Sequence, residues 1–209
     1  MAGIWEETFK DKQTMWGLEP SDSAILASDI FMEKGFKNVL IPGFGYGRNG
    51  KVFFDKGMSV TGIEISETAI SIAKENYGSG MKIFNGSVAE MPFDKKHYDG
   101  IFCYALIHLL NKKERKKLLD DCFTQLRTNG CMIFIAISRK APSYGSGKEL
   151  SKNRFEIFKD VKMFFYDPDS ITNEFGKYGL VDFYEIDEPV KNMTDKQPQK
   201  FWFIKCEKH

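Results

Sequence analysis

The residues best suited to chemistry in this chain are three glycines at alternate positions, Gly43, Gly45 and Gly47. They follow the apolar run 39–41 and precede a helix-compatible segment, which predicts a tight turn between a strand and a helix. Such a turn lets backbone approach a ligand without an intervening side chain. A second apolar run ends in an acid, Glu64. A glycine turn after one strand and an acid at the end of the next can bind an adenosine cofactor, because the acid accepts hydrogen bonds from ribose hydroxyls.

Two alternatives to this interpretation stay open. The segment Gly45-x-Gly47-x-x-Gly50 also has the spacing of a dinucleotide-binding turn. In that pattern the first glycine directly follows the strand, but Gly43 holds that place, and the sixth position counted from it is Arg48. An arginine is bulky where a helix must pack closely on a strand, so NAD is the less favoured cofactor. The alternative for the acid is an ordinary solvated strand end.

The elements around these residues alternate between strand and helix signals up to residue 137. We expect helices over residues 21–35, 49–56, 66–76, 111–127 and 169–178, which begin at Ser21, Asn49, Ser66, Asn111 and Asp169. Gly130 follows the fourth of these helices and marks its end. We expect strands over 39–41, 58–64, 81–84, 101–104, 131–137, 181–186 and 201–206. Repeated strand–helix units predict a parallel sheet with helices on both faces. The last two strands lack a helix between them, and their connection, which holds Asn192 and Asp195, predicts a hairpin-like return into an antiparallel strand.

Composition is that of an ordinary globular protein. The 209 residues are 42% hydrophobic and 28% charged, with a net charge of +1, so no overall field attracts nucleic acid or a membrane. We expect a single domain over 1–209, with an N-terminal cap over 1–35 and a substrate lid inserted over 138–168, since long loops in compact domains are usually functional. The alternative for the insertion is an extra helix or hairpin beside the sheet.

The four cysteines have no metal-ligand or paired spacing, so they predict buried thiols in a reducing compartment and no metal site. The N-terminus has no apolar signal core and no run spans a bilayer, so we expect a cytoplasmic protein without a membrane partner. The lysine-rich run 112–117 lacks interleaved aromatic residues and indicates a solvated helix face, so no nucleic acid partner is expected.

Several motifs together resemble the class I S-adenosylmethionine-dependent methyltransferases over nearly the whole chain. Beside the glycine turn and the acid, the segments similar to that family are 85–93, 98–102 and 126–130. Segments 16–21 and 40–43 resemble its small-molecule branch, which includes thiopurine, halide/thiol and tellurite-resistance enzymes, and 144–149 and 153–155 resemble the tellurite type. The resemblance implies an α/β, doubly wound, mostly parallel seven-stranded sheet with an antiparallel C-terminal strand, the Rossmann-like methyltransferase fold.

The activity implied by this resemblance is methyl transfer from S-adenosyl-L-methionine to a small-molecule acceptor by in-line displacement, which leaves S-adenosyl-L-homocysteine. The chain has Ile41 and Ser87 where the family commonly has acids. A regulator that binds S-adenosylmethionine without catalysis therefore stays an alternative, beside an NAD-dependent oxidoreductase and an RNA or protein methyltransferase. Oligomeric state and the identity of the acceptor stay open.

The resemblance also implies site residues. Those expected at the cofactor are Trp16, Gly43, Gly45, Gly47, Arg48, Asn49, Glu64, Ile65, Ser87, Val88 and Cys103. The sulfonium cation suits an aromatic face such as that of Trp16, which otherwise packs against the rim of the sheet. Arg48 and Asn49 reach the carboxylate of the cofactor or face water. Cys103 is a small wall residue and not a nucleophile, because nothing near it in sequence lowers its pKa.

Substrate contacts are expected from Trp5, Tyr144, Arg154 and Tyr166. Arg154 suits an anionic acceptor, and a salt bridge with Glu149 or Glu156 is the alternative. His108 and Tyr104 are candidate catalytic residues, because an acceptor that holds its proton at neutral pH needs a general base. A buried structural role is the alternative for His108.

Overall fold

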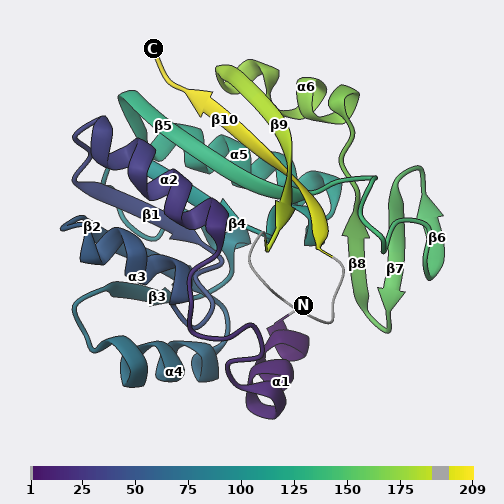
Figure 1. The fold of residues 1–209 in the computed structure, drawn as a ribbon, viewed down its shortest axis with the longest axis horizontal. Helices are drawn as coiled ribbons and strands as arrows, with labels where there is room; N and C mark the ends of the chain where they lie inside the picture. Colours follow the sequence, from purple (N-terminus) through teal and green to yellow (C-terminus); the bar gives the residue numbers. More distant parts are fainter. Residues whose placement is uncertain (1, 190–197) are drawn as a thin grey trace.

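A mixed sheet of seven strands forms the centre of the molecule (Figure 1). The computed structural model describes residues 2–189 and 198–209. The strands lie in the order β3-β2-β1-β4-β5-β10-β9. Their bounds are β1 Asn38–Pro42, β2 Ser59–Glu64, β3 Lys82–Asn85, β4 Tyr98–Tyr104, β5 Leu126–Ile137, β9 Leu180–Glu188 and β10 Gln199–Glu207.

Strands β1 to β5 are parallel, and β10 is antiparallel to both of its neighbours, β5 and β9. The predicted mostly parallel sheet with an antiparallel C-terminal strand is therefore confirmed. The predicted return between the last two strands falls partly on Asn192 and Asp195, which lie outside the described residues.

Helices cover both faces of the sheet (Figure 1). They are α1 Ala2–Lys12, α2 Asp22–Glu33, α3 Arg48–Asp55, α4 Glu67–Tyr77, α5 Lys112–Gln125 and α6 Pro168–Phe175, with the short 3-10 helices η1 Val88–Glu90, η2 Ile107–Leu109 and η3 Gly176–Tyr178. The core on one face includes side chains of α2, α3 and α4, and the core on the other includes side chains of α5 and α6. Strand β5 is apolar on both sides because it contributes to both cores: residues 131, 133, 135 and 137 pack on the first face, and 132, 134 and 136 on the second.

The predicted helix starts at Ser21, Ser66 and Asn111 are confirmed, since each of these side chains accepts a hydrogen bond from the first turn of its helix. Two expected boundaries are wrong. Helix α5 ends at Gln125, and Gly130 lies within β5, because pairing with β4 starts at Leu126. Helix α6 is capped by Asp167 and not by Asp169, which lies in its first turn.

The expected irregular insertion over 138–168 is instead largely ordered as a small antiparallel sheet. It contains β6 Lys148–Ser151, β7 Arg154–Phe158 and β8 Val161–Phe164. Its aromatic side chains pack into the first core, where the rings of Tyr144, Phe155 and Phe165 meet edge to face. Its secondary structure is therefore that of the alternative, a hairpin-like addition beside the main sheet, and its role as a substrate lid stays a prediction.

Helix α1 was not expected from the sequence. It lies against α4 (Figure 1), and Phe9 is the buried residue of its contact face. Among the described residues, no helix is both long and apolar enough to cross a bilayer. The four cysteines are free and buried, as predicted.

Candidate active site

The glycine turn has the backbone that its sequence predicts. Gly43, Gly45 and Gly47 have φ angles of +71°, +57° and +86°, which residues with a side chain rarely adopt. Gly47 also forms the N-cap of α3. A Cβ atom at Gly43 would lie 3.0 Å from the Leu106 side chain, whereas one at Gly45 would meet nothing within 4 Å. The turn is therefore packed at its first glycine and open to a ligand at its second.

Glu64 lies at the end of β2, beside this opening. One carboxylate oxygen accepts a hydrogen bond from Gly45 N at 2.7 Å, and the other accepts from Ile65 N and Ser66 N at 2.8 and 2.9 Å. The side chain is buried, and burial raises its pKa. The predicted acid and the predicted turn are thus in direct contact, and Ile65 contributes its backbone. Glu64 is no solvated strand end.

Phe44 is a part of the turn that sequence reasoning missed. Its buried ring lies between α3 and β2, where a Cβ atom at Gly62 would approach it at 2.5 Å and one at Gly50 would overlap its tip. Gly50 therefore leaves room for a phenyl ring, which explains the glycine that mimics a dinucleotide pattern. A signal was available: glycines in the middle of a strand and of a helix usually mark close packing.

The segment before α2 is fastened to the glycine turn through Tyr46. The Tyr46 hydroxyl donates to Gly17 O at 2.8 Å and accepts from Trp16 N at 3.1 Å. The Trp16 ring stacks on the Tyr46 ring at a centroid distance of 6.2 Å and is 46% exposed. Trp16 therefore combines packing on the turn with an exposed surface that a ligand can cover.

Two other predicted cofactor residues hold this segment in place. Arg48 donates from Nη1 to the carbonyl oxygens of Trp16 and Glu19, at 3.2 and 3.0 Å. Asn49 is buried, and its Oδ1 accepts from Ser21 N at 2.9 Å. Both residues therefore contact the segment before α2, and their predicted contact with the cofactor stays a prediction.

The remaining predicted cofactor residues follow β3 and β4. Ser87 caps η1, where its hydroxyl accepts from Ala89 N at 3.2 Å, and Val88 is half-buried against the second core. Cys103 is fully buried in that core, which raises the pKa of its thiol. Its side chain is therefore a core residue and lines no open surface.

Tyr104, at the end of β4, lies among charged groups. Burial raises the pKa of its hydroxyl, the carboxylates of Glu188 and Asp22 raise it further, and Arg48 opposes them. The Arg48 guanidinium lies 5.7 Å from the centre of the Tyr104 ring. Sequence reasoning missed Glu188, which lies at the end of β9. Its buried carboxylate accepts from Asp22 N and Ser23 N at 2.9 and 3.3 Å.

His108 is a structural residue in this fold. It is 3% exposed, and its Nδ1 accepts a hydrogen bond from Ile137 N at 3.2 Å. Burial lowers its pKa to about 3. A neutral imidazole with this contact holds η2 against β5, so the expectation of a general base is corrected in favour of the structural alternative.

The four predicted substrate residues do not lie together at one site. Tyr166 is fully buried and donates to Glu174 at 2.9 Å, so it does not face a ligand. Tyr144 packs in the small sheet and donates to Asn153 at 3.2 Å. Trp5 lies in the aromatic contact of α1 and also borders a small hollow beside η2. Arg154 lines a larger cavity.

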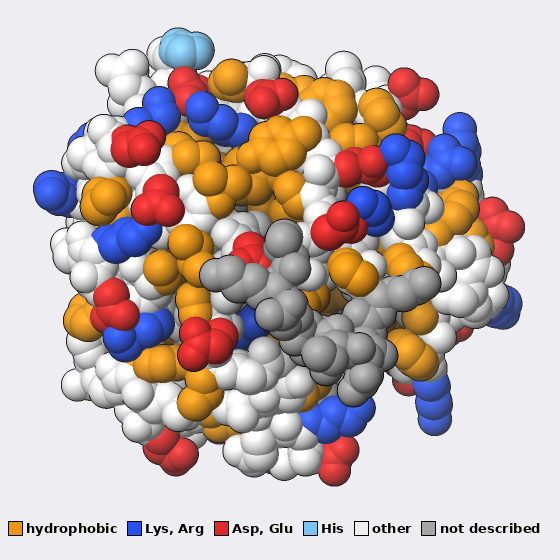
Figure 2. Space-filling model, in the orientation of Figure 1, with side chains coloured by type: hydrophobic (Ala, Val, Ile, Leu, Met, Phe, Trp, Pro, Cys, Tyr) orange, Lys and Arg blue, Asp and Glu red, His pale blue; other side chains and the backbone are white. Residues whose placement is uncertain are grey.

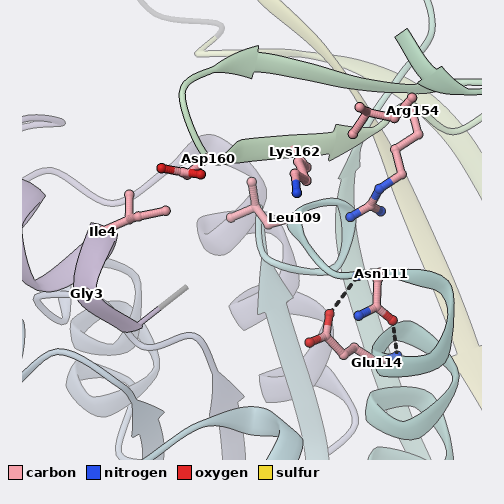
Figure 3. A pocket seen from close by; sticks show the side chains of 9 residues that line it. Gly3, Ile4, Leu109, Asn111, Glu114, Arg154, Asp160 and Lys162 are labelled. Atoms are coloured by element: carbon pink, nitrogen blue, oxygen red, sulfur yellow. Dashed lines mark hydrogen bonds between the residues drawn. The ribbon is translucent and has the colours of Figure 1, made fainter. Parts of the chain in front are cut away.

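That cavity lies between the small sheet, the start of α5 and α1 (Figure 3), and has a volume of about 730 Å³. Its lining residues are Gly3, Ile4, Leu109, Asn111, Glu114, Leu150, Arg154, Asp160 and Lys162. They come from distant parts of the chain, which explains why the sequence indicated only one of them. On the face that Figure 2 shows, basic and acidic side chains are interspersed.

Comparison with known families identifies the segment that holds the glycine turn. Residues 39–130 match the family model described as a methyltransferase domain. The similarity to that family lies in this segment, which is less than half of the chain. The matched segment runs from β1 to the middle of β5 and includes Glu64 and Tyr104. No curated protein matches the sequence.

Solved structures resemble this chain over nearly its whole length. A 1,6-didemethyltoxoflavin-N1-methyltransferase of Burkholderia thailandensis, with 1,6-didemethyltoxoflavin and S-adenosylhomocysteine bound, has a TM-score of 0.75 at 15% identity, covering 100% of this chain and 87% of that one. The CcbJ methyltransferase of Streptomyces caelestis has a TM-score of 0.72 at 16% identity and 98% coverage of both chains. TehB of Haemophilus influenzae has a TM-score of 0.66 at 16% identity, covering 98% of this chain and 67% of that one. At these identities the likeness is one of fold.

Proposed function

We propose that this protein transfers the methyl group of S-adenosylmethionine to a small-molecule acceptor. The observation that carries the proposal is the contact between Glu64 and the open glycine turn at Gly45, within the segment that matches the methyltransferase family. The turn offers a surface without side chains, and the buried acid beside it suits the hydroxyls of a ribose. The small-molecule acceptor is supported by the fold likeness to the 1,6-didemethyltoxoflavin-N1-methyltransferase, whose structure holds 1,6-didemethyltoxoflavin.

The residues of this chain fit that cofactor as follows. Gly45 and Glu64 would hold the nucleoside, Ser87 and Val88 would lie beside the base, and Trp16 would cover the sulfonium end. Arg48 would act indirectly, because it keeps the Trp16 segment in position. When bound, the cofactor supplies a strongly electrophilic methyl group. The protein contributes alignment and exclusion of water, for which effective molarities reach roughly 10⁵–10⁸ M.

No general base is assigned. His108 is buried and neutral, and the raised pKa of Tyr104 makes it a poor base at neutral pH. The site therefore suits an acceptor that is already nucleophilic at neutral pH, such as a thiol or another soft anion, since such groups need little help. This preference agrees with the proposed thiol and tellurite branches of the family.

The test is isothermal titration calorimetry with S-adenosylhomocysteine, with NADH titrated in parallel. We expect binding of S-adenosylhomocysteine alone, and at least about tenfold weaker binding by Glu64→Gln, because that change removes a charged acceptor of hydrogen bonds. Glu67→Gln, an exposed acid in the next helix, is the matched control. Binding of NADH in place of S-adenosylhomocysteine would reject the proposal. Equal binding by wild type and Glu64→Gln would reject the role of Glu64.

A further inference from the structure

Arg154 is a half-buried cation without a carboxylate partner in the described part of the chain. Its Nη1 donates a hydrogen bond to Leu110 O at 2.7 Å. The alternative from the sequence, a salt bridge of Arg154 with Glu149 or Glu156, is not formed. Burial and the nearby Arg115 both lower its pKa. A cation that is partly desolvated and repelled by a second cation is a favourable partner for an incoming anion.

The neighbouring Arg115 does not supply an open site of this kind. Its guanidinium is 4% exposed and holds Glu174 through Nη2–Oε1 and Nε–Oε2 contacts of 2.7 and 2.9 Å. It also donates to Leu110 O, the carbonyl that Arg154 contacts, at 3.2 Å. Arg115 is therefore satisfied within the protein, whereas Arg154 keeps donors available at the wall of the cavity.

Lys162 adds a second cation to the same wall. In the β7–β8 pairing, Arg154 lies opposite Phe164 and Glu156 lies opposite Lys162, so Arg154 and Lys162 share one face of the small sheet. Glu156 lies on that face as well, and its Oε1 accepts a hydrogen bond from Asp160 N at 3.1 Å. Figure 3 shows the Arg154 side chain extending toward the start of α5, and Lys162 at the same cavity beside Leu109. Lys162 forms no ion pair with any carboxylate of the described residues.

The acids of the cavity offset this charge only in part, since Glu114 raises the pKa of Arg154 but burial and Arg115 outweigh it. Glu114 accepts from Asn111 N at 2.7 Å as part of the α5 capping box, at the positive end of that helix. Asp160 lies in the turn between β7 and β8, on the side of Ile4 and away from Arg154 (Figure 3). The wall also has apolar side chains, those of Ile4, Leu109 and Leu150.

We propose that this cavity holds the methyl acceptor, and that the acceptor is an amphipathic acid whose carboxylate is bound by Arg154 and Lys162 while its apolar body lies against Ile4 and Leu109. The inference rests on the proposed methyltransferase function. It deepens that function by naming the acceptor class: an anionic group at one end and the nucleophilic atom at the other, with apolar atoms between them.

A matched pair of thiols tests the charge requirement. The probes are 6-mercaptohexanoate and 6-mercaptohexanamide, which differ in the carboxylate alone, titrated calorimetrically into protein saturated with S-adenosylhomocysteine. We expect the carboxylate to bind at least about tenfold more tightly, the effect of one or two charge-assisted hydrogen bonds. Equal affinity for the two probes, including no binding of either, would overturn the inference.

Variants locate the effect. Arg154→Gln should remove most of the preference for the carboxylate, leaving the part that Lys162 contributes, without changing the affinity for S-adenosylhomocysteine, and Arg154→Lys should keep more of it. Lys152→Gln, which removes an exposed cation of the β6–β7 turn outside the cavity, should keep all of it. Lys162→Gln, also exposed, gives a second test if Arg154→Gln does not fold, and it should weaken the carboxylate probe alone.

The outcomes separate this inference from the proposed function. Failure of S-adenosylhomocysteine to bind rejects the methyltransferase proposal. Binding of S-adenosylhomocysteine without a preference for the carboxylate rejects the acceptor class and leaves the methyltransferase proposal standing. A preference that persists in full in both Arg154→Gln and Lys162→Gln places the anion elsewhere and overturns the site.

Discussion

Phe44 fixes the glycine turn to the strand and helix on either side of it. Because its Cγ and Cδ2 atoms lie 2.5 Å from the position of a Cβ at Gly62, Gly62→Ala forces the ring to move. We expect this variant to lose ~1–3 kcal/mol of unfolding free energy in urea titrations, the usual cost of overpacking a core. Adding Phe44→Leu should restore part of the loss. Gly176→Ala, with open space around its Cβ, is the control and should change stability little; equal losses in both alanine variants would contradict the packing argument.

The buried imidazole of His108 predicts a pH dependence of stability. Its pKa is lowered to about 3 in the fold, from an ordinary value of 6.5, so the unfolded chain takes up a proton in this window that the folded chain does not. The stabilising effect is complete above pH 6.5 and is lost as the pH falls toward 3, by at most about 1.4 kcal/mol per pH unit.

Urea unfolding between pH 7 and pH 4, in wild type and His108→Gln, measures this effect. We expect the wild type to lose more stability than the variant as the pH falls, because only the wild type carries the titrating imidazole. Parallel curves for the two proteins would contradict a buried neutral imidazole. A general base at this position would instead place a pKa near the ordinary histidine value in the pH dependence of methyl transfer.

At the residue scale, the sequence predicted those site residues whose signal is local. The glycine turn and Glu64 each follow an apolar run, so their place at the sheet edge could be read directly. Asn49 and Glu188 could not be assigned in this way, because their roles depend on Ser21 and Asp22, which are distant in sequence. Tyr166 was misassigned because the sequence of a segment gives no indication of whether a ring in it faces the core or a ligand.

Hydrogen bonds to one acid of helix α1 join this helix to α4, beside the packing of Phe9, and they give a prediction at the scale of elements. The Glu6 carboxylate accepts from Ser66 Oγ and Thr68 Oγ1, both at 2.7 Å, at the N-terminus of α4. The hydrogen bond from the Thr68 side chain is the largest cause that lowers its pKa, to about 2. This stabilisation is complete above the ordinary pKa of 4.5 and is lost as the pH falls toward 2.

Glu6→Gln should therefore release α1 at neutral pH. Limited trypsin digestion reports this release as cleavage after Lys10 and Lys12, which we expect to be several-fold faster than in wild type. Glu7→Gln is the matched control, since that side chain is 76% exposed and forms an ion pair with Lys10 of its own helix, so its digestion should match wild type. Equal digestion of Glu6→Gln and wild type would show that Phe9 and the aromatic contacts hold the helix without the carboxylate.

The elements themselves differ in how far the sequence determines them. The buried strands and capped helices of the main sheet were predicted because their apolar runs and their caps are local signals. The small sheet was not, because β6 to β8 are short and carry charged residues, and their turns depend on Asn153 and Asp160 at φ +64° and +65°. Helix α1 has a weak apolar pattern, and its position depends on α4.

At the scale of the whole molecule, one buried ion pair joins the layers around the cavity. Arg115 of α5 pairs with Glu174 of α6, and its guanidinium lies 4.1 Å from the centre of the Phe164 ring in β8. Tyr166 donates to the same carboxylate at 2.9 Å. The pair therefore connects two helices of the main domain with the small sheet that carries Arg154.

Breaking this pair on one side should destabilise the whole fold. Glu174→Gln leaves the guanidinium of Arg115 buried without a charge partner, and we expect a loss of ~3 kcal/mol in urea unfolding, at the lower end for buried pairs because Glu174 keeps some exposure. Arg115→Met combined with Glu174→Leu should recover much of this loss, since apolar side chains do not carry the desolvation cost of two charges. Lys51→Gln, which breaks an exposed pair with Asp55, should cost less than about 1 kcal/mol. Replacing both side chains also removes the hydrogen bond from Arg115 to Leu110 O and the one from Tyr166 to Glu174. A double variant no more stable than Glu174→Gln would therefore show that these hydrogen bonds, and not the buried charge, hold the main sheet and the small sheet together.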